Sequence, residues 1–138
     1  MSATGQCLCG TVSYKVNGDP QMSLVCHCRN CQRQAGTAFS TLLGIAKTDF
    51  ELTGAEPKLY VDNTSTSGNP VSRYFCANCG SPLYSALDAY PDTIFLKAGT
   101  LDDVSDFSPA VHIWCDSKQP WVTLDDDVAQ IGTQLDVA

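Results

Sequence analysis

Short stretches of alternating hydrophobic and polar residues recur along the chain. In residues 10–16 the apolar Val12, Tyr14 and Val16 alternate with polar residues, which is typical of a strand with one buried face. Other runs, rich in β-branched or aromatic residues and bounded by Gly, Pro, Asn, Asp and Ser, predict strands at 22–28, 39–46, 58–61, 72–75, 93–97 and 111–115. No long segment keeps a 3.6-residue period, and residues 29–36 fit a loop or one short helical turn. The pattern predicts an all-β fold.

Length and composition favour one domain. With 138 residues, 43% of them hydrophobic, the chain can bury one globular core. We predict a single domain over residues 1–138, with an exposed turn at 62–70 and an acidic tail at 122–138. No apolar run approaches the roughly 20 residues of a membrane helix. The first residues show neither the basic nor the apolar region of a secretory signal, so we expect a cytoplasmic protein without a membrane partner.

Charge and cysteine content narrow the function. The net charge is −7, and the eight Lys and Arg form no long basic stripe, which excludes binding to nucleic-acid phosphates. The chain has eight cysteines. In a cytosolic protein, clustered cysteines more often bind metal or do redox chemistry than form a disulfide framework, which is the alternative.

The first cysteine group pairs CxCG at residues 7–10 with CxxCG at residues 76–80. A CxxC turn followed by glycine is typical of a zinc knuckle, because backbone N–H groups point at the thiolates and glycine tolerates a positive φ. In CxC, residues i and i+2 lie on one face of an extended chain, so both sulfurs can reach one ion. Four thiolates complete the tetrahedral coordination of zinc, which predicts a closed, structural site with the ligands Cys7, Cys9, Cys76 and Cys79.

The second group, CHCRNC at residues 26–31, overlaps a CxC with a CxxC. Cys26, Cys28 and Cys31 can turn toward one ion, whereas His27 should face the other way. Three thiolates without a fourth ligand nearby are typical of an open zinc site, the kind that catalytic centres use. The three cysteines would then be catalytic as well as metal-binding.

A closed second site is the alternative, with Cys115 as the fourth ligand and His112 behind it. In the strand predicted at 111–115, however, Cys115 would share a face with two aliphatic residues and behave as a small buried hydrophobe. This placement favours the open site.

Charged and titratable residues near the second group suggest further roles. Arg29 and Arg33, two of only three arginines, flank the cluster. They would offset the charge of about −1 on a zinc held by three thiolates, and they suit the carboxylates of a bound substrate. His27 or His112 could donate a proton near neutral pH.

Five motifs occur in order: CxCG (7–10), CHCxxCxxxxG (26–36), RYFCANCGSPLY (73–84), AGTLDD (98–103) and HIWCDSKQPW (112–121). Together, from about residue 5 to residue 121, they resemble the glutathione-dependent formaldehyde-activating enzyme family, which shares a domain with centromere protein V. The resemblance implies an Mss4-like fold of coiled antiparallel sheets. It implies a structural zinc at the first group and, at the second, a zinc where the thiol of glutathione is thought to bind. At position 115, where an aliphatic residue is expected, this chain has cysteine.

The activity that the resemblance implies is condensation of formaldehyde with glutathione to S-(hydroxymethyl)glutathione, classed as a carbon–sulfur lyase. Zinc would favour the deprotonated thiol and hold it beside an aldehyde. We therefore predict a zinc-dependent carbon–sulfur lyase with two zinc ions, whose partners are a thiol such as glutathione and an aldehyde. A non-catalytic, zinc-stabilised binding scaffold is the alternative. Thiol–disulfide exchange through Cys28 and Cys31 is disfavoured, because the βαβ context of such motifs is absent.

Overall fold

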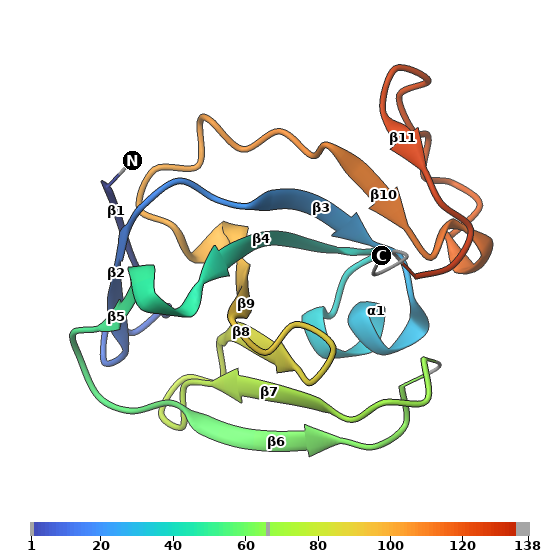
Figure 1. The fold of residues 1–138 in the computed structure, drawn as a ribbon. Coiled ribbons are helices and arrows are strands. Elements are labelled where there is room, and N and C mark those ends of the chain that lie inside the picture. Colours follow the sequence, from blue (N-terminus) through green and yellow to red (C-terminus); the bar gives the residue numbers. More distant parts are fainter. Residues whose placement is uncertain (1, 66, 135–138) are drawn as a thin grey trace.

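The computed structural model, which describes residues 2–65 and 67–134, is built around two β-sheets (Figure 1). The small sheet has the order β1 (Ser2–Gln6), β2 (Ser13–Asn17) and β5 (Phe50–Leu52). The large sheet has the order β11 (Ala129–Gln130), β10 (Val111–Ile113), β3 (Met22–Cys26), β4 (Ser40–Ala46), β9 (Thr93–Lys97), β8 (Pro82–Leu87), β7 (Val71–Phe75) and β6 (Lys58–Asp62). The helical elements are α1 (Arg29–Ala35) and the 3₁₀ turns η1 (Lys47–Asp49), η2 (Ala98–Thr100) and η3 (Cys115–Ser117). The predicted all-β class is confirmed.

Strand pairing is antiparallel except at one end of the large sheet. There β10 runs parallel to both β3 and β11. The β10–β3 register sets Ile113 opposite Cys26. This pairing brings residues from the last third of the chain beside the second cysteine group.

The middle of the large sheet is buried on both faces, and β9 shows this most directly because all five of its residues are buried. The edge strand β6, in contrast, is largely exposed. Ile94 and Leu96 point to one face, where the small sheet contributes Tyr14 and Val16 to a common core. Phe95 points to the opposite face, where a second core cluster contains Leu24, Leu42 and Ile113 together with Cys26 and Cys31. The second cysteine group is therefore built into the face of the large sheet that the small sheet does not cover.

Most predicted strands are present with shifted ends. The strand predicted at 93–97 matches β9 at both ends, and residues 29–36 hold a longer helix than the predicted single turn. The strand predicted at 111–115 was wrong in its last two positions. Trp114 adopts a left-handed conformation (φ 57°), which ends β10 at Ile113, and Cys115 begins η3. The alternation that placed Cys115 beside two aliphatic residues therefore does not apply.

The predicted acidic tail and exposed turn are described only in part, because residues 135–138 and residue 66 lie outside the described ranges. Within the tail, Asp125, Asp126 and Asp127 are exposed, and β11 follows them. In the turn, Asp62 is buried as the last residue of β6, whereas most of the following described residues are more exposed. Among the described residues, no helix is long and apolar enough to cross a membrane. The single-domain boundary stays a prediction.

Candidate metal centres and active site

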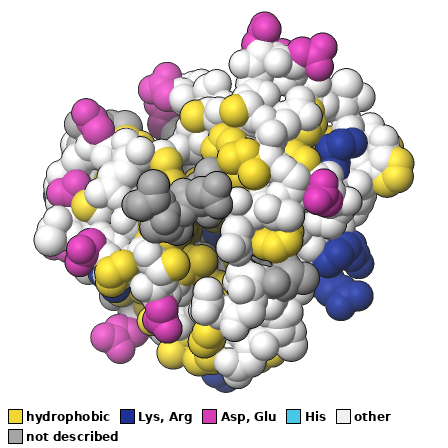
Figure 2. All heavy atoms as spheres, turned by 45° about the vertical axis from the view of Figure 1, so that its right-hand side comes forward, with side chains coloured by type: hydrophobic (Ala, Val, Ile, Leu, Met, Phe, Trp, Pro, Cys, Tyr) yellow, Lys and Arg dark blue, Asp and Glu magenta, His cyan; other side chains and the backbone are white. Residues whose placement is uncertain are grey.

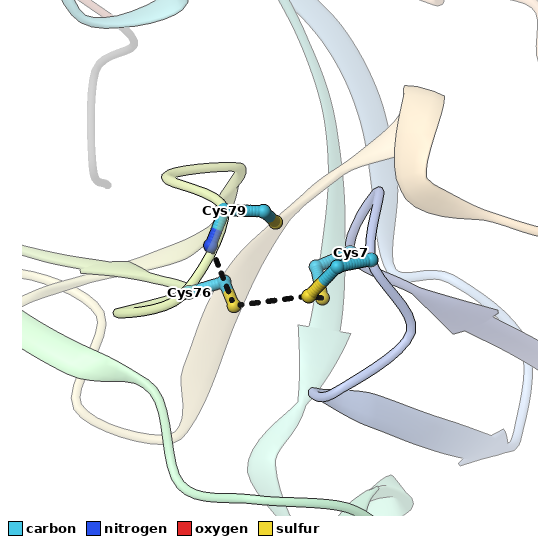
Figure 3. A group of neighbouring side chains, drawn as sticks. Cys7, Cys76 and Cys79 are labelled. Atoms are coloured by element: carbon cyan, nitrogen blue, oxygen red, sulfur yellow. Dashed lines mark hydrogen bonds between the residues drawn. The ribbon is translucent and has the colours of Figure 1, made fainter.

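Four sulfur atoms meet between two turns that lie far apart in sequence. Cys7 and Cys9 belong to the turn between β1 and β2, and Cys76 and Cys79 to the turn between β7 and β8 (Figure 3). The Sγ atoms all lie within 4.8 Å of one another, with Cys7 to Cys9 at 3.6 Å and Cys9 to Cys76 at 3.8 Å. Sulfurs placed tetrahedrally at about 2.3 Å from a zinc ion would be about 3.8 Å apart. The donor set therefore fits zinc.

The two turns share one backbone geometry. Gly10 and Gly80 both have φ of +80°, in the left-handed region that glycine adopts without strain. Each donates its N–H to the carbonyl of the first cysteine of its turn, Gly10 to Cys7 (3.1 Å) and Gly80 to Cys76 (2.8 Å). The prediction that the CxC segment is extended was wrong, because the chain turns after Cys7 to close this hydrogen bond. The turn brings both sulfurs of the CxC segment to the same side.

Hydrogen bonds rather than charged groups surround these four thiols. Bonds to Thr11 and then to Asn78 lower the pKa of Cys9 to about 7. Bonds to Ser81 lower the pKa of Cys79 to about 5. Low thiol pKa values favour the thiolate, the form that binds metal. These bonds prepare the group for a cation without adding a charged partner.

The first group also joins the two sheets. Cys7 and Cys76 are each 1% exposed and pack in one core cluster with Val12 and Leu83. The N–H of Leu8 donates to Ser81 Oγ across the two turns (3.0 Å). A metal bound here would cross-link the small sheet to the β7–β8 part of the large sheet, as a structural ion does.

The second group gathers three sulfurs within six residues. Cys26 ends β3, Cys28 caps the N-terminus of α1 and Cys31 lies in the first turn of α1. The cap is made by Cys28 Sγ, which accepts the N–H of Cys31 (3.2 Å). The three Sγ atoms lie within 4.8 Å of one another. The strand end and the helix start therefore aim all three sulfurs at one point.

A cavity of about 160 Å³ adjoins this point, and all three cysteines line it. Much of its wall is apolar and comes from the uncovered face of the large sheet and the loop after β8. The apolar lining residues include Leu24, Leu42, Leu87, Tyr90, Phe95 and Ile113. The three sulfurs therefore face a space that a small ligand can enter, whereas the cavity lining contains none of the four cysteines of the first group.

Two cations act on the second group, and neither was predicted. Hydrogen bonds from Cys26 and Cys28 lower the pKa of Cys31, and the charges of Lys97 and Arg73 lower it further. Lys97 is buried on β9 and donates from Nζ to Ser40 Oγ (2.5 Å). No local motif indicates either cation, because Arg73 and Lys97 lie some 40 and 65 residues after Cys31 and only the sheet brings them near it.

Arg73 is held by a buried ion pair. Its Nη2 and Nε lie 2.9 and 3.0 Å from Asp62 Oδ2, and the two side chains are 9% and 6% exposed. Asn30 Nδ2 donates to the same carboxylate oxygen (3.1 Å). Burial acts to raise the pKa of Asp62, but hydrogen bonds from Thr64, Arg73 and Asn30 outweigh it and lower the pKa to about 2. The network links α1, which carries Cys31, to β6 and β7.

The predicted substrate-binding arginines lie elsewhere on α1. Arg29 and Arg33 are both exposed, and neither lines the cavity. Arg29 Nη1 donates to Gln32 Oε1 (2.5 Å). Their role toward a substrate stays a prediction, whereas Arg73 is the arginine in the cavity wall.

The two histidines contact each other. His27 Nε2 and His112 Nδ1 are 3.0 Å apart, and neither residue lines the cavity. Burial first, and then the nearby His112 and Lys118, lower the pKa of His27 to about 4. His27 points away from the three sulfurs, as its place between two cysteines predicts.

Cys115 does not join the three-sulfur group among the described residues. Its Sγ lies 3.5 Å from the backbone carbonyl of His112. Burial raises the pKa of its thiol, which disfavours the metal-binding thiolate. In the part of the chain that the structure describes, the second group therefore offers three thiol ligands.

Comparison with known proteins places the chain in a family. The sequence model of the glutathione-dependent formaldehyde-activating enzyme family matches residues 2–117. The name of one Fusarium vanettenii protein assigns it provisionally to that activity. It is 26% identical to this chain over 83 residues, which are 60% of this chain and 43% of that protein. The chain thus aligns with less than half of that relative's length. A crystal structure of a Rhodobacter sphaeroides protein shares the fold, with a TM-score of 0.59, 22% identity and coverage of 75% of this chain and 91% of that one.

The family match extends over most of the chain and includes the turns and helix that carry both cysteine groups, Cys7 to Cys79. The match confirms the family resemblance that the order of the five sequence motifs indicates. This chain belongs to the glutathione-dependent formaldehyde-activating enzyme family.

Proposed function

We propose that the protein is a zinc-dependent carbon–sulfur lyase that joins a thiol such as glutathione to an aldehyde carbon and, in reverse, separates them. The observation that carries the proposal is the cavity lined by all three sulfurs of the second group. Its support is the family match, because glutathione and formaldehyde are the substrates in the family's name. The proposal includes two zinc ions, one held by each cysteine group.

The residues of the second group would bind the metal and position the substrate thiol. Bound zinc would supply a site where a thiol loses its proton near neutral pH. Cys26, Cys28 and Cys31 would hold it through three thiolates. Lys97 and Arg73 would offset the negative charge that these thiolates add to a largely apolar wall.

In the reaction, the substrate sulfur forms a bond to the aldehyde carbon while the carbonyl π-bond breaks. The thiol releases one proton and the carbonyl oxygen takes up one, so the product is a hemithioacetal with no change in oxidation state. The cavity wall contains the hydroxyl-bearing residues Ser85 and Tyr90, which could donate hydrogen bonds to that oxygen. His27 and His112 are not in the wall, so we do not assign them the proton transfer.

Most of a glutathione molecule would lie outside the cavity. Its volume of about 160 Å³ is below the roughly 300 Å³ at the lower end of small-molecule sites. We propose that the thiol end enters and that the peptide carboxylates remain near the surface, where Arg29 and Arg33 on α1 are exposed. A reducing cytoplasm would suit eight free cysteines and a free thiol substrate.

The test is the rate of hemithioacetal formation. Zinc-loaded protein, glutathione and ¹³C-labelled formaldehyde should exchange faster than the mixture without protein, as measured by exchange NMR. The Cys31→Ser variant should return the rate to the spontaneous value, and Cys115→Val should keep the enhanced rate, because Cys115 lies outside the three-sulfur group. A wild-type rate equal to the spontaneous one across a range of thiols would reject the lyase and favour a zinc-stabilised scaffold.

A further inference from the structure

The cavity beside the three sulfurs is larger than formaldehyde needs. Its volume of about 160 Å³ is several times the roughly 30 Å³ that one water molecule takes up in the liquid. Formaldehyde has a single carbon. A bound formaldehyde beside the thiol end of glutathione would therefore still leave part of the cavity to solvent or empty.

The wall chemistry indicates what would fill the remaining space. Leu24, Leu42, Phe95 and Ile113 belong to the core cluster that contains Cys26 and Cys31, so the sulfurs and an apolar surface form one continuous wall. Leu87 and Tyr90 extend this wall. Among the described residues, Arg73 is the one charged side chain in the lining, and it is already paired with Asp62. Of the possible ligand groups, an apolar one would lose the least solvation free energy on binding to this wall.

Figure 2 shows the same character on a larger scale. It looks toward the side of the molecule where α1 lies and β3 and β10 end. Hydrophobic side chains form several patches across this face, acidic side chains lie mainly toward its top and left edges, and Lys and Arg side chains lie at its right edge (Figure 2). The acidic edge would not repel an uncharged ligand that approaches this face.

We propose that the cavity binds the unbranched apolar chain of the aldehyde, so that the substrate class is aliphatic aldehydes longer than propanal, up to about six carbons in all. The inference rests on the proposed lyase function and deepens it. The aldehyde carbon meets the substrate sulfur beside Cys26, Cys28 and Cys31, while the alkyl chain lies against Leu24, Leu42 and Phe95. The bond changes are those of hemithioacetal formation, with no further reactant.

The first experiment measures kcat/KM with glutathione for propanal, butanal, pentanal and hexanal. Carbonyl reactivity is nearly constant across this series, so changes report binding of the chain. Each added CH₂ that is buried should raise kcat/KM about fourfold. The gain from propanal to hexanal should reach roughly 60-fold, provided that all three added CH₂ groups are buried.

A second measurement needs no catalysis. Hexanamide has a similar chain but does not add thiols, so it tests binding alone. It should saturate and shift the methyl NMR signals of Leu24, Leu42 and Ile113. Leu87→Trp, which places a larger ring in the half-buried part of the cavity wall, should abolish this shift and flatten the aldehyde series. Val104→Trp, at a 56% exposed position outside the cavity lining, is the matched control and should change neither.

The outcomes separate this inference from the proposed function. A rising series that Leu87→Trp flattens supports it. Acceleration with formaldehyde but a flat series and no hexanamide binding overturns the inference and leaves the lyase standing. Hexanamide binding without acceleration for any thiol and aldehyde overturns the lyase and, with it, the assignment of the chain to an aldehyde.

Discussion

The two cysteine groups use the same ligand atom in two different surroundings. The first collects four sulfurs from turns some 70 residues apart, with two of its cysteines almost fully buried. The second collects three sulfurs from six consecutive residues, and these line a cavity. A fourth thiol closes the coordination of zinc, whereas a cavity at the fourth position leaves it open to a substrate. From the number of thiols and their place in the sheets, we propose a structural role for the first group and a chemical role for the second.

Their electrostatic surroundings differ as well. The first group has hydroxyl and amide partners such as Thr11, Ser81 and Asn78. The second group has two buried cations, Lys97 and Arg73, near Cys31. The negative charge of thiolates in a poorly solvated wall costs free energy unless opposite charges offset it. Fixed cations beside the second group would therefore stabilise its thiolates while a fourth ligand exchanges. The predictions below test this division, beginning with the largest effect.

Loss of one ligand in the first group should have the largest effect. Cys76→Ser should leave little soluble folded protein, because a structural zinc contributes about 10–16 kcal/mol of binding free energy to folding, as much as a typical domain's entire stability. Yield, zinc content and circular dichroism after purification measure this. A Cys76→Ser protein with wild-type melting behaviour would remove the structural role.

Loss of one ligand in the second group should remove function without unfolding the protein. Cys31→Ser should lose one zinc equivalent and the rate enhancement, yet still unfold cooperatively, since the first group continues to join the two sheets. Metal analysis and thermal unfolding on one sample compare it with Cys76→Ser. If both variants fail to fold, the two groups do not differ in the way that we propose.

The ion pair behind the second group should have an effect of about 2 kcal/mol on stability. The pKa of Asp62 is lowered to about 2 in the folded protein, so its contribution is fully present above about pH 4 and is lost as the pH falls toward 2. Asp62→Asn should therefore be less stable than the wild type by the same amount at pH 6 and at pH 7, where the thiolates still hold zinc. Urea unfolding of both proteins at these two pH values measures the difference.

The matched control for that experiment is Asp125→Asn, because Asp125 is exposed in the tail. It should change the unfolding free energy by less than about 0.5 kcal/mol at any pH. Equal stability of Asp62→Asn and the wild type at pH 6 would contradict the assigned role of the carboxylate.

The smallest effect is expected at Cys115. Cys115→Val should keep both zinc ions, and its unfolding free energy should change by less than about 1.5 kcal/mol, because this residue is outside both groups among the described residues. Zinc content by mass spectrometry of the native protein decides the point. Loss of one zinc equivalent would make Cys115 a ligand and the second site closed.

The sequence predicted features that depend on neighbouring residues. The all-β class, the strand at 93–97 and the two cysteine groups all followed from local spacing. It missed four short or irregular strands, β1, β5, β8 and β11. Ser2–Gln6 (β1) lacks a β-branched run, and Pro82 interrupts the pattern at the start of Pro82–Leu87 (β8). In the structure β1 pairs with β2, and β8 pairs with β7 and β9, the strands next to it in sequence.

The same limit applies to the candidate site. Local spacing favoured Arg29 and Arg33, which flank the cysteines but are exposed. The cations that act on Cys31 come from β7 and β9, and the apolar wall from four further strands. Only the register of the large sheet brings these residues together, and no short motif carries that register.

Cobalt substitution followed by titration with glutathione measures the openness of the second site most directly. We predict two cobalt ions per chain with sulfur-to-metal charge-transfer bands, and a saturable change in the bands of one ion only. That change should disappear in Cys31→Ser and remain in Cys115→Val. Spectra that do not respond to any thiol, with two cobalt ions bound, would show both sites closed and would contradict the proposed chemistry at Cys26, Cys28 and Cys31.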